Sequence, residues 1–162
     1  LRQGPARVTR LALLDTNPLA EDEAVRAGRA RQIARADAGD LDEMMADTFI
    51  PRYVAARGTT LKVRQRIEIL CHEMATDLGP EVFVRQSRAL RDRPDQCATL
   101  RSFDGPALLL CGAEDTLCPP DRHVLMAQLM PQAQLRMVPE AGHLPTLEKP
   151  QQTTEALRQW LS

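Results

Sequence analysis

Asp115 and His143 are the two side chains of this sequence whose positions could support acid–base chemistry. Each ends a short polar segment, residues 112–115 and 140–143, that follows an apolar run. A carboxylate bonded to one imidazole nitrogen fixes the tautomer of the ring and stabilises the charge that the ring gains as a base. The sequence therefore predicts a carboxylate–imidazole pair, provided that the two segments lie side by side in the fold.

The elements around these segments predict that they do. Residues 107–111 and 134–138 are short runs typical of strands, and residues 121–130 and 150–161 have the pattern of helices. This alternating order indicates a parallel sheet with right-handed crossovers, in which neighbouring strands end at the same edge. Residues 8–14, an apolar run followed by turn-forming residues, predict a further buried strand.

The middle of the chain, from about residue 21 to 101, favours helices, because β-branched residues are sparse there. Its clearest helix spans residues 60–78, with Gly79 as a C-terminal cap and Pro80 opening a second helix. Five residues follow the spacing of one apolar helix face, whose Met and Leu positions either pack into a core or line a pocket. They are Ile67, Leu70, Cys71, Met74 and Leu78.

Composition excludes several classes of function. The formal net charge of the 162 residues is −1, which gives no reason to expect a nucleic acid or an acidic membrane as partner. We expect neither a membrane span nor a secretory signal. The four cysteines show no CxxC pair and no histidine–cysteine ligand spacing, so we expect no metal site and reduced thiols in a cytoplasmic protein.

Three motifs resemble the C-terminal signature of the α/β-hydrolase family. Pro-Ala-Leu-Leu-Leu-Cys-Gly-Ala-Glu-Asp ends at Asp115, Val-Pro-Glu-Ala-Gly-His-Leu contains His143, and Glu-Lys-Pro follows at residues 148–150. The resemblance implies an α/β fold: the C-terminal part of an α/β-hydrolase, with three parallel strands, flanking helices and an all-helical cap.

The same resemblance divides the chain into three parts. Residues 1–17 would form a core strand of the hydrolase domain, residues 18–101 the helical cap, and residues 102–162 the C-terminal part of the hydrolase domain. Asp115 would be the acid and His143 the base of a catalytic triad, with no cofactor and no metal.

The activity implied by the resemblance is hydrolysis of a small, hydrophobic ester or related substrate. Haloalkane dehalogenases and epoxide hydrolases use the same Asp–His pair with an aspartate nucleophile, so their chemistry stays open. The alternative function is that of a truncated, inactive relative that binds a partner or dimerises.

Other side chains compete for the acid role or could do separate chemistry. Glu114 is a neighbour of Asp115. Asp15 ends the first predicted strand, where some α/β-hydrolases have their acid, although the residues after it favour an Asx-type turn cap. The remaining candidates are interpreted as structural: His72 and His123 as helix residues, Cys118 as packing, and Arg26, Arg29, Arg31 and Arg35 as a solvated helix face.

The sequence contains no nucleophile for this pair. The family places it, usually a serine, in Gly-x-Ser-x-Gly between a strand and a helix. Ser87, Ser102 and Ser162 are the only serines, and none has that context. We therefore expect the nucleophile and the N-terminal half of the fold to lie outside this chain, which alone should not hydrolyse substrate. The strand at residues 8–14 would then have a free edge, covered by that half or by self-association.

Overall fold

The computed structural model describes residues 1–162 and contains one parallel three-stranded sheet with the order β1-β2-β3. The strands are β1 (Leu11–Leu14), β2 (Ala107–Gly112) and β3 (Gln134–Val138). The helices are α1 (Glu23–Asp37), α2 (Leu41–Met44), α3 (Leu61–Arg91), α4 (Cys97–Arg101), α5 (Pro120–Leu129), α6 (Pro145–Glu148) and α7 (Pro150–Leu161), with single turns of 3₁₀- or π-helix at Pro5–Arg7, Met45–Phe49 and Ile50–Arg52. The predicted α/β class is confirmed.

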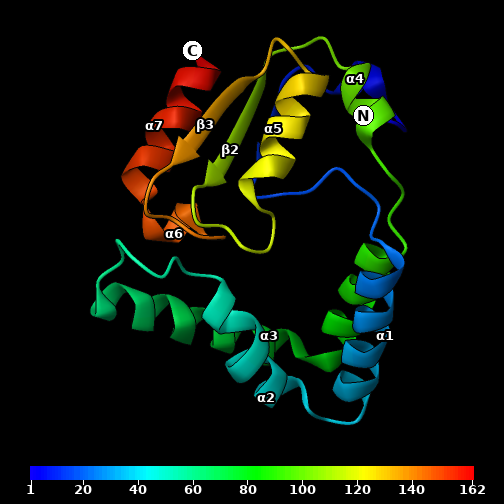
Figure 1. Cartoon of the computed structure of the whole chain (residues 1–162), viewed down its shortest axis with the longest axis vertical. Helices are drawn as coiled ribbons and strands as arrows, with labels where there is room; N and C mark the ends of the chain where they lie inside the picture. Colours follow the sequence, from blue (N-terminus) through cyan, green and yellow to red (C-terminus); the bar gives the residue numbers. More distant parts are fainter.

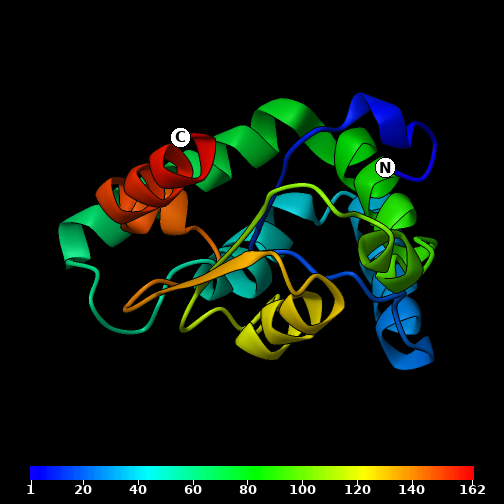
Figure 2. The same ribbon diagram turned by 90° about the horizontal axis from the view of Figure 1, so that it is seen from above.

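Strand β2 is the centre of the sheet, and every one of its residues is buried. Leu109 points to the face where Met126 of α5 packs, whereas Leu108 and Leu110 point to the opposite face, which Ala156 of α7 covers. Figure 2 shows α5 and α7 on the two sides of the strands. A continuous apolar run suits a strand that is covered on both faces.

Strand β1 is shorter than predicted and forms an edge of the sheet. Pairing with β2 begins only at Leu11, because the 3₁₀ turn Pro5–Arg7 precedes it and residues 8–10 do not reach β2. The amides of Leu11 and Asp15 donate to carbonyl oxygens of residues 106 and 110, both at 3.0 Å. Because parallel pairing uses alternate residues, the amides of Ala12 and Leu14 point to the free edge.

All elements between β1 and β2 are helical, and those from α1 to α3 (residues 23–91, the helical region) form a core of their own, whereas α4 packs with the sheet and α5. Ile33 of α1, Met44 of α2 and Val84 of α3 are buried in that core. Figure 1 shows α2 and the first part of α3 beyond the carboxyl ends of the strands, where the arrowheads of β2 and β3 point. This arrangement places the helical region over the strand ends that were expected to bear the functional residues.

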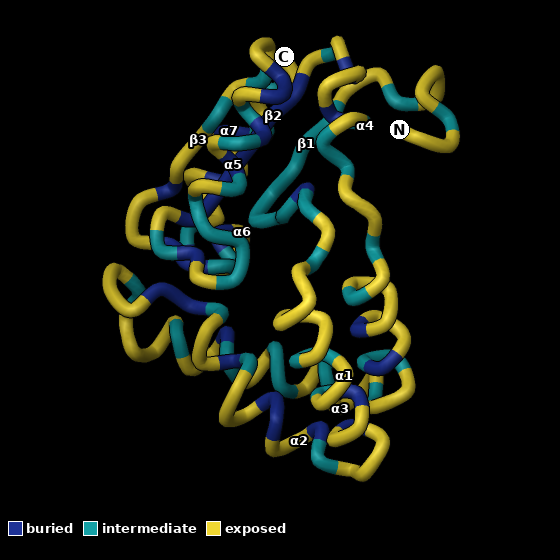
Figure 3. The backbone as a smooth tube through the Cα atoms, turned by 45° about the vertical axis from the view of Figure 1, so that its right-hand side comes forward, coloured by how far each residue is buried: buried dark blue, intermediate teal, exposed yellow.

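Two helices meet within α3 at the predicted break, where Gly79 has a non-helical φ of 75° before Pro80. The predicted apolar face is buried only at Ile67 and partly at Cys71, whereas Met74 and Leu78 are 54% and 53% exposed. Within this chain most of the face therefore does not pack into a core, and Figure 3 colours much of α3 as exposed. Neither α3, which is the longest helix, nor any other combines the length and apolar surface that crossing a bilayer requires.

Candidate active site

The loops that follow β2 and β3 lie against each other at the carboxyl ends of the strands. The backbone amide of Ala113 donates to the carbonyl oxygen of Val138 at 2.9 Å. Gly112 permits the close approach, because a β-carbon at this position would overlap the carbonyl oxygens of Ala141 and Gly142. The parallel register of β2 and β3 thus brings both predicted site residues to one place.

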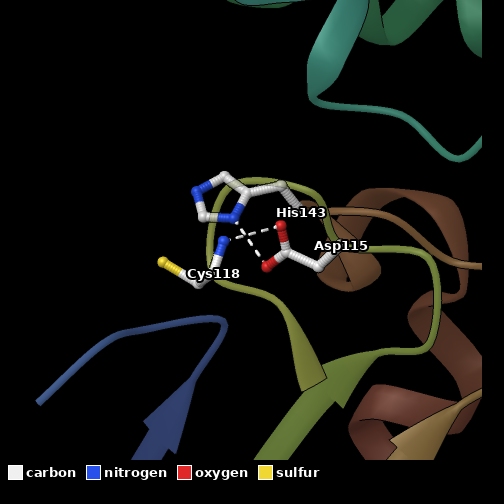
Figure 4. Close-up of side chains that lie close together, drawn as sticks. All are labelled: Asp115, Cys118 and His143. Carbon is white, nitrogen blue, oxygen red and sulfur yellow. Dashed lines mark hydrogen bonds and ion pairs between the residues drawn. The ribbon is translucent and has the colours of Figure 1, made fainter. Parts of the chain in front are cut away.

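Asp115 and His143 contact each other directly (Figure 4). Oδ2 of Asp115 lies 2.9 Å from Nδ1 of His143, and Oδ1 accepts hydrogen bonds from the backbone amides of Leu117 at 2.8 Å and Cys118 at 3.0 Å. The Asp115 side chain is 0% exposed. Burial opposes its ionisation, but the bonds from His143 and the two amides outweigh burial and lower the pKa of Asp115. Asp115 is therefore a carboxylate at neutral pH.

The imidazole of His143 is held on one side and open on the other. Its backbone amide donates to the carbonyl oxygen of Tyr53 in the helical region at 2.9 Å. The ring is 25% exposed, and the Tyr53 ring lies tilted beside it with the centroids 6.1 Å apart. Because a carboxylate only accepts hydrogen bonds, Nδ1 bears a hydrogen, and in the neutral ring the lone pair is then on Nε2. A neutral imidazole in this state can accept a proton at Nε2.

A buried carboxylate, that of Glu148, ties the His143 loop to the helical region. Its Oε1 accepts from the amide of Gly142 at 2.8 Å, and its Oε2 accepts from the amide of Ala55 at 2.8 Å and from the hydroxyl of Thr59 at 3.3 Å. Glu148 entered the sequence analysis only as part of a motif, without a role. The signal that could have found it is its place in the Glu-Lys-Pro motif, five residues after His143.

Asp15 lies at the end of β1, next to this site, and its carboxylate bonds across the sheet. Oδ1 accepts from the amide of Gly112 at 2.8 Å, and the backbone of Asp15 adopts a φ of 44°. The expected Asx-type cap is formed two residues later, where Asn17 accepts from the amide of Leu19 at 3.0 Å. Burial raises the pKa of Asp15 to about 7 despite the bond from Gly112, and the charge of Asp115 adds to the rise.

The contacts of the other candidate residues distinguish them from Asp115 and His143. Glu114 makes no side-chain hydrogen bond to His143, so Asp115 is its carboxylate partner. His72 pairs with Asp42 on the helical region at 2.9 Å. His123 is fully buried and accepts from the amide of Thr16 at 3.3 Å, which the interpretation as an ordinary helix residue did not anticipate.

Cys118 and one residue of the arginine run, Arg29, each lie in surroundings that the sequence-based interpretation did not predict. Cys118, expected to be packing, has its thiol within 4.8 Å of ligand atoms of Asp115 and His143. The predicted solvated arginine face contains one exception, since Arg29 makes a bidentate ion pair with the buried carboxylate of Glu21 at 2.5 Å.

The serines have local roles, and neither of the two main cavities borders the Asp115–His143 pair. The hydroxyl of Ser102 donates to the carbonyl of Thr99, that of Ser162 donates to the carbonyl of Gln159, and Ser87 is buried in α3. A cavity of about 410 Å³ borders β1 and α4, and its lining includes neither Asp115 nor His143.

Comparison with known proteins identifies the fold family. Residues 55–150, more than half of the chain, match the family described as alpha/beta hydrolase fold. The chain belongs to the α/β-hydrolase family. The matched residues include both Asp115 and His143, so the resemblance read from the motifs is confirmed at the level of the family.

Two relatives define the similarity further. A thermophilic esterase from Thermogutta terrifontis, solved with malate bound, superimposes with a TM-score of 0.88 over 99% of this chain at 29% identity. A segment of 60 residues, 37% of this chain, is 38% identical to the sn-1-specific diacylglycerol lipase ABHD11 of Mus musculus.

An enol-lactonase from Burkholderia xenovorans LB400 has the same fold, with a TM-score of 0.81 over 96% of this chain at 19% identity. The chain spans only 58% of the esterase and 56% of the enol-lactonase, and its match covers 20% of the mouse lipase.

Proposed function

We propose that this chain supplies the acid, Asp115, and the base, His143, of a nucleophile–His–Asp triad in a hydrolase. The observation that supports this proposal most is the 2.9 Å bond between Oδ2 of Asp115 and Nδ1 of His143. Asp115 is buried and ionised, whereas the ring of His143 is partly open, which is the arrangement that a base oriented by a carboxylate requires.

The chemistry of the pair follows from its hydrogen bonds. Nε2 of His143 takes the proton of the nucleophile as that group attacks the carbonyl carbon, and it later returns a proton to the leaving group. Asp115 keeps the hydrogen on Nδ1 and stabilises the imidazolium while both nitrogens are protonated. The two amides that donate to Oδ1 keep Asp115 ionised throughout.

The nucleophile and the oxyanion hole belong, in this proposal, to residues outside the chain. None of its three serines lies in a Gly-x-Ser-x-Gly motif, and two of them bond to local carbonyls. The chain alone would therefore be inactive. A serine nucleophile is favoured by the likeness to the Thermogutta esterase, whereas an aspartate there would give dehalogenase or epoxide hydrolase chemistry.

The substrate that we propose is a small, hydrophobic ester. Support comes from the esterase, at 29% identity over almost the whole chain, and from the mouse lipase, whose name also specifies ester cleavage. The helical region supports the same class, because its apolar core lies over the strand ends and would form the lid of a pocket. A location in the cytoplasm stays a prediction.

Complementation tests this proposal. The part of the Thermogutta esterase that this chain does not cover would be fused ahead of Leu1, and hydrolysis of p-nitrophenyl butyrate and palmitate would be measured. We expect activity from the fusion, none from either part alone, and preference for the shorter acyl chain. A folded fusion that fails to react with a fluorophosphonate probe and hydrolyses neither ester would contradict the proposed function.

A further inference from the structure

The thiol of Cys118 has no role in the proposed hydrolysis, yet it lies beside the Asp115–His143 pair (Figure 4). Its Sγ, a carboxylate oxygen of Asp115 and a ring nitrogen of His143 all lie within 4.8 Å of one another. The backbone of Cys118 is fixed on both sides, because its amide donates to Asp115 and its carbonyl accepts from the thiol of Cys111 at 3.7 Å. Its own thiol makes no hydrogen bond, so it can turn toward a ligand.

We propose that Asp115, Cys118 and His143 form a three-ligand site for a thiophilic divalent cation, with Zn²⁺ as the preferred ion. One sulfur, one imidazole nitrogen and one carboxylate oxygen are a zinc ligand set, whereas Mg²⁺ and Ca²⁺ take oxygen ligands alone. Three protein ligands leave the fourth tetrahedral position open to water or to another ligand.

The geometry is close to that of a bound ion. Zinc–ligand distances of about 2.0–2.3 Å place neighbouring ligand atoms of a tetrahedron about 3.5 Å apart. Because the three atoms already lie within 4.8 Å of one another, no pair has to approach by more than about 1.3 Å to reach this spacing. The ligands come from two loops, after β2 and after β3, which explains why no ligand spacing is visible along the sequence.

Some charges around the site oppose the thiolate form of Cys118 and others favour it. Asp115 is an anion, and burial together with its charge raises the pKa of the Cys118 thiol to about 11, so Zn²⁺ must displace the thiol proton into solvent as the Zn–S bond forms. Arg93 and Arg122 act on Cys118 with the opposite sign and favour its thiolate. The complete site would therefore place two anionic ligands on the cation.

A bound ion would switch off the proposed base. The ion takes the Asp115 oxygen and one nitrogen of His143, so the hydrogen bond between them is replaced and the imidazole can no longer be oriented to accept a proton. This regulatory consequence depends on the proposed function, but metal binding itself does not. Binding can therefore be measured on the chain without any turnover.

Titration of the reduced chain with Zn²⁺ by calorimetry, and with Co²⁺ by absorbance, tests the site. We expect one ion per chain and a thiolate-to-cobalt charge-transfer band. Cys118→Ser should abolish the band, and both Cys118→Ser and His143→Ala should weaken Zn²⁺ binding by about 100-fold, because losing a ligand costs at least as much as losing a group that only orients one.

The chain offers a matched control for each substitution. Cys97→Ser removes a thiol that lies 3.6 Å from the carboxylate of Asp95, without a histidine beside it. His72→Ala removes an imidazole that lies 2.9 Å from Asp42 and belongs to no group of three potential metal ligands. We expect both controls to bind Zn²⁺ as tightly as the parent.

Two results would overturn the site. One is a cobalt spectrum of the parent chain that lacks the thiolate band. This result does not depend on the folding of any variant. The other is a folded Cys118→Ser chain, verified by circular dichroism, that binds Zn²⁺ with unchanged affinity. Cobalt binding without hydrolysis in the complemented protein would contradict the proposed function and support the metal site. Hydrolysis without cobalt binding would support the proposed function and contradict the metal site.

Discussion

At neighbouring strand ends, Asp15 and Asp115 acquire opposite acid–base properties, although burial opposes the ionisation of both. Asp115 accepts two backbone amides and bonds to His143, so its pKa is lowered. Asp15 accepts one amide, from Gly112, and burial with the nearby charge of Asp115 raises its pKa to about 7. Burial raises the pKa of each carboxyl group and hydrogen bonds to the carboxylate lower it, so the number of these bonds decides the direction of the net shift.

The raised pKa of Asp15 predicts a pH-dependent stability. Between the ordinary value of 3.8 and about 7, the folded chain keeps a proton that the unfolded chain has released, so this group lowers stability as pH rises through that window. Asp15→Asn keeps an oxygen acceptor for Gly112 but cannot ionise. We expect it to raise the free energy of unfolding by about 2 kcal/mol at pH 8. This value is smaller than the free energy that corresponds to the whole pKa shift, because the side chain is only partly buried.

Urea unfolding of parent and Asp15→Asn at several pH values between 4 and 8 would measure this effect. The difference in the free energy of unfolding should be near zero at the acid end and should grow as pH rises. A difference that is the same at both ends would mean that Asp15 does not titrate in this window.

Sequence reasoning found the Asp115–His143 pair because strand order and loop motifs both placed it at one sheet edge. It did not find the contacts of Asp15, Cys118 or Glu148. Asp15 bonds to Gly112 through the β1–β2 register, and Cys118 reaches His143 through the fold of a loop. Neither register nor loop conformation follows from residue types and spacing.

At the scale of elements, the turn at α6 connects the helical region to the sheet through Glu148. Both of its carboxylate oxygens accept backbone amides, from Gly142 and from Ala55. Glu148→Gln would replace one acceptor with a donor and leave one buried amide without a partner. We expect a loss of about 1–3 kcal/mol in the free energy of unfolding.

Glu155→Gln is the matched control, because Glu155 is exposed on α7 and bonds only to the side chain of Gln159. Its effect should stay within about 0.5 kcal/mol. Equal stability of the two variants in thermal unfolding would exclude the proposed connecting role of Glu148.

Helix α3 shows what periodicity can and cannot predict. The spacing of its apolar residues correctly predicted a helix, and Gly79 with Pro80 correctly predicted its break. It could not predict burial, because Met74 and Leu78 need a covering element and the chain provides none. An amphipathic pattern identifies an apolar face but not the group that covers it.

At the scale of the whole molecule, β1 is an edge strand whose outer amides, those of Ala12 and Leu14, have no partner strand. Such an edge can pair with a second copy of the chain. We expect the chain alone to self-associate in sedimentation velocity experiments. Ala12→Pro removes one outer amide without touching the bonds to β2, so it should lower the associated fraction.

Ala12→Gly is the control, since it keeps the amide and should keep most of the association. Association that is unaffected by the proline, or a parent chain that stays monomeric at high concentration, would exclude pairing through this edge.

The measurement that tests the Asp115–His143 pair most directly is the turnover of the complemented esterase with His143→Ala, compared with His72→Ala. Both substitutions remove an imidazole that lies 2.9 Å from an aspartate. If His143 is the base, its loss lowers kcat by about 10³-fold or more, whereas the loss of His72 leaves kcat nearly unchanged. Equal kcat values for the two variants would contradict the catalytic role of His143.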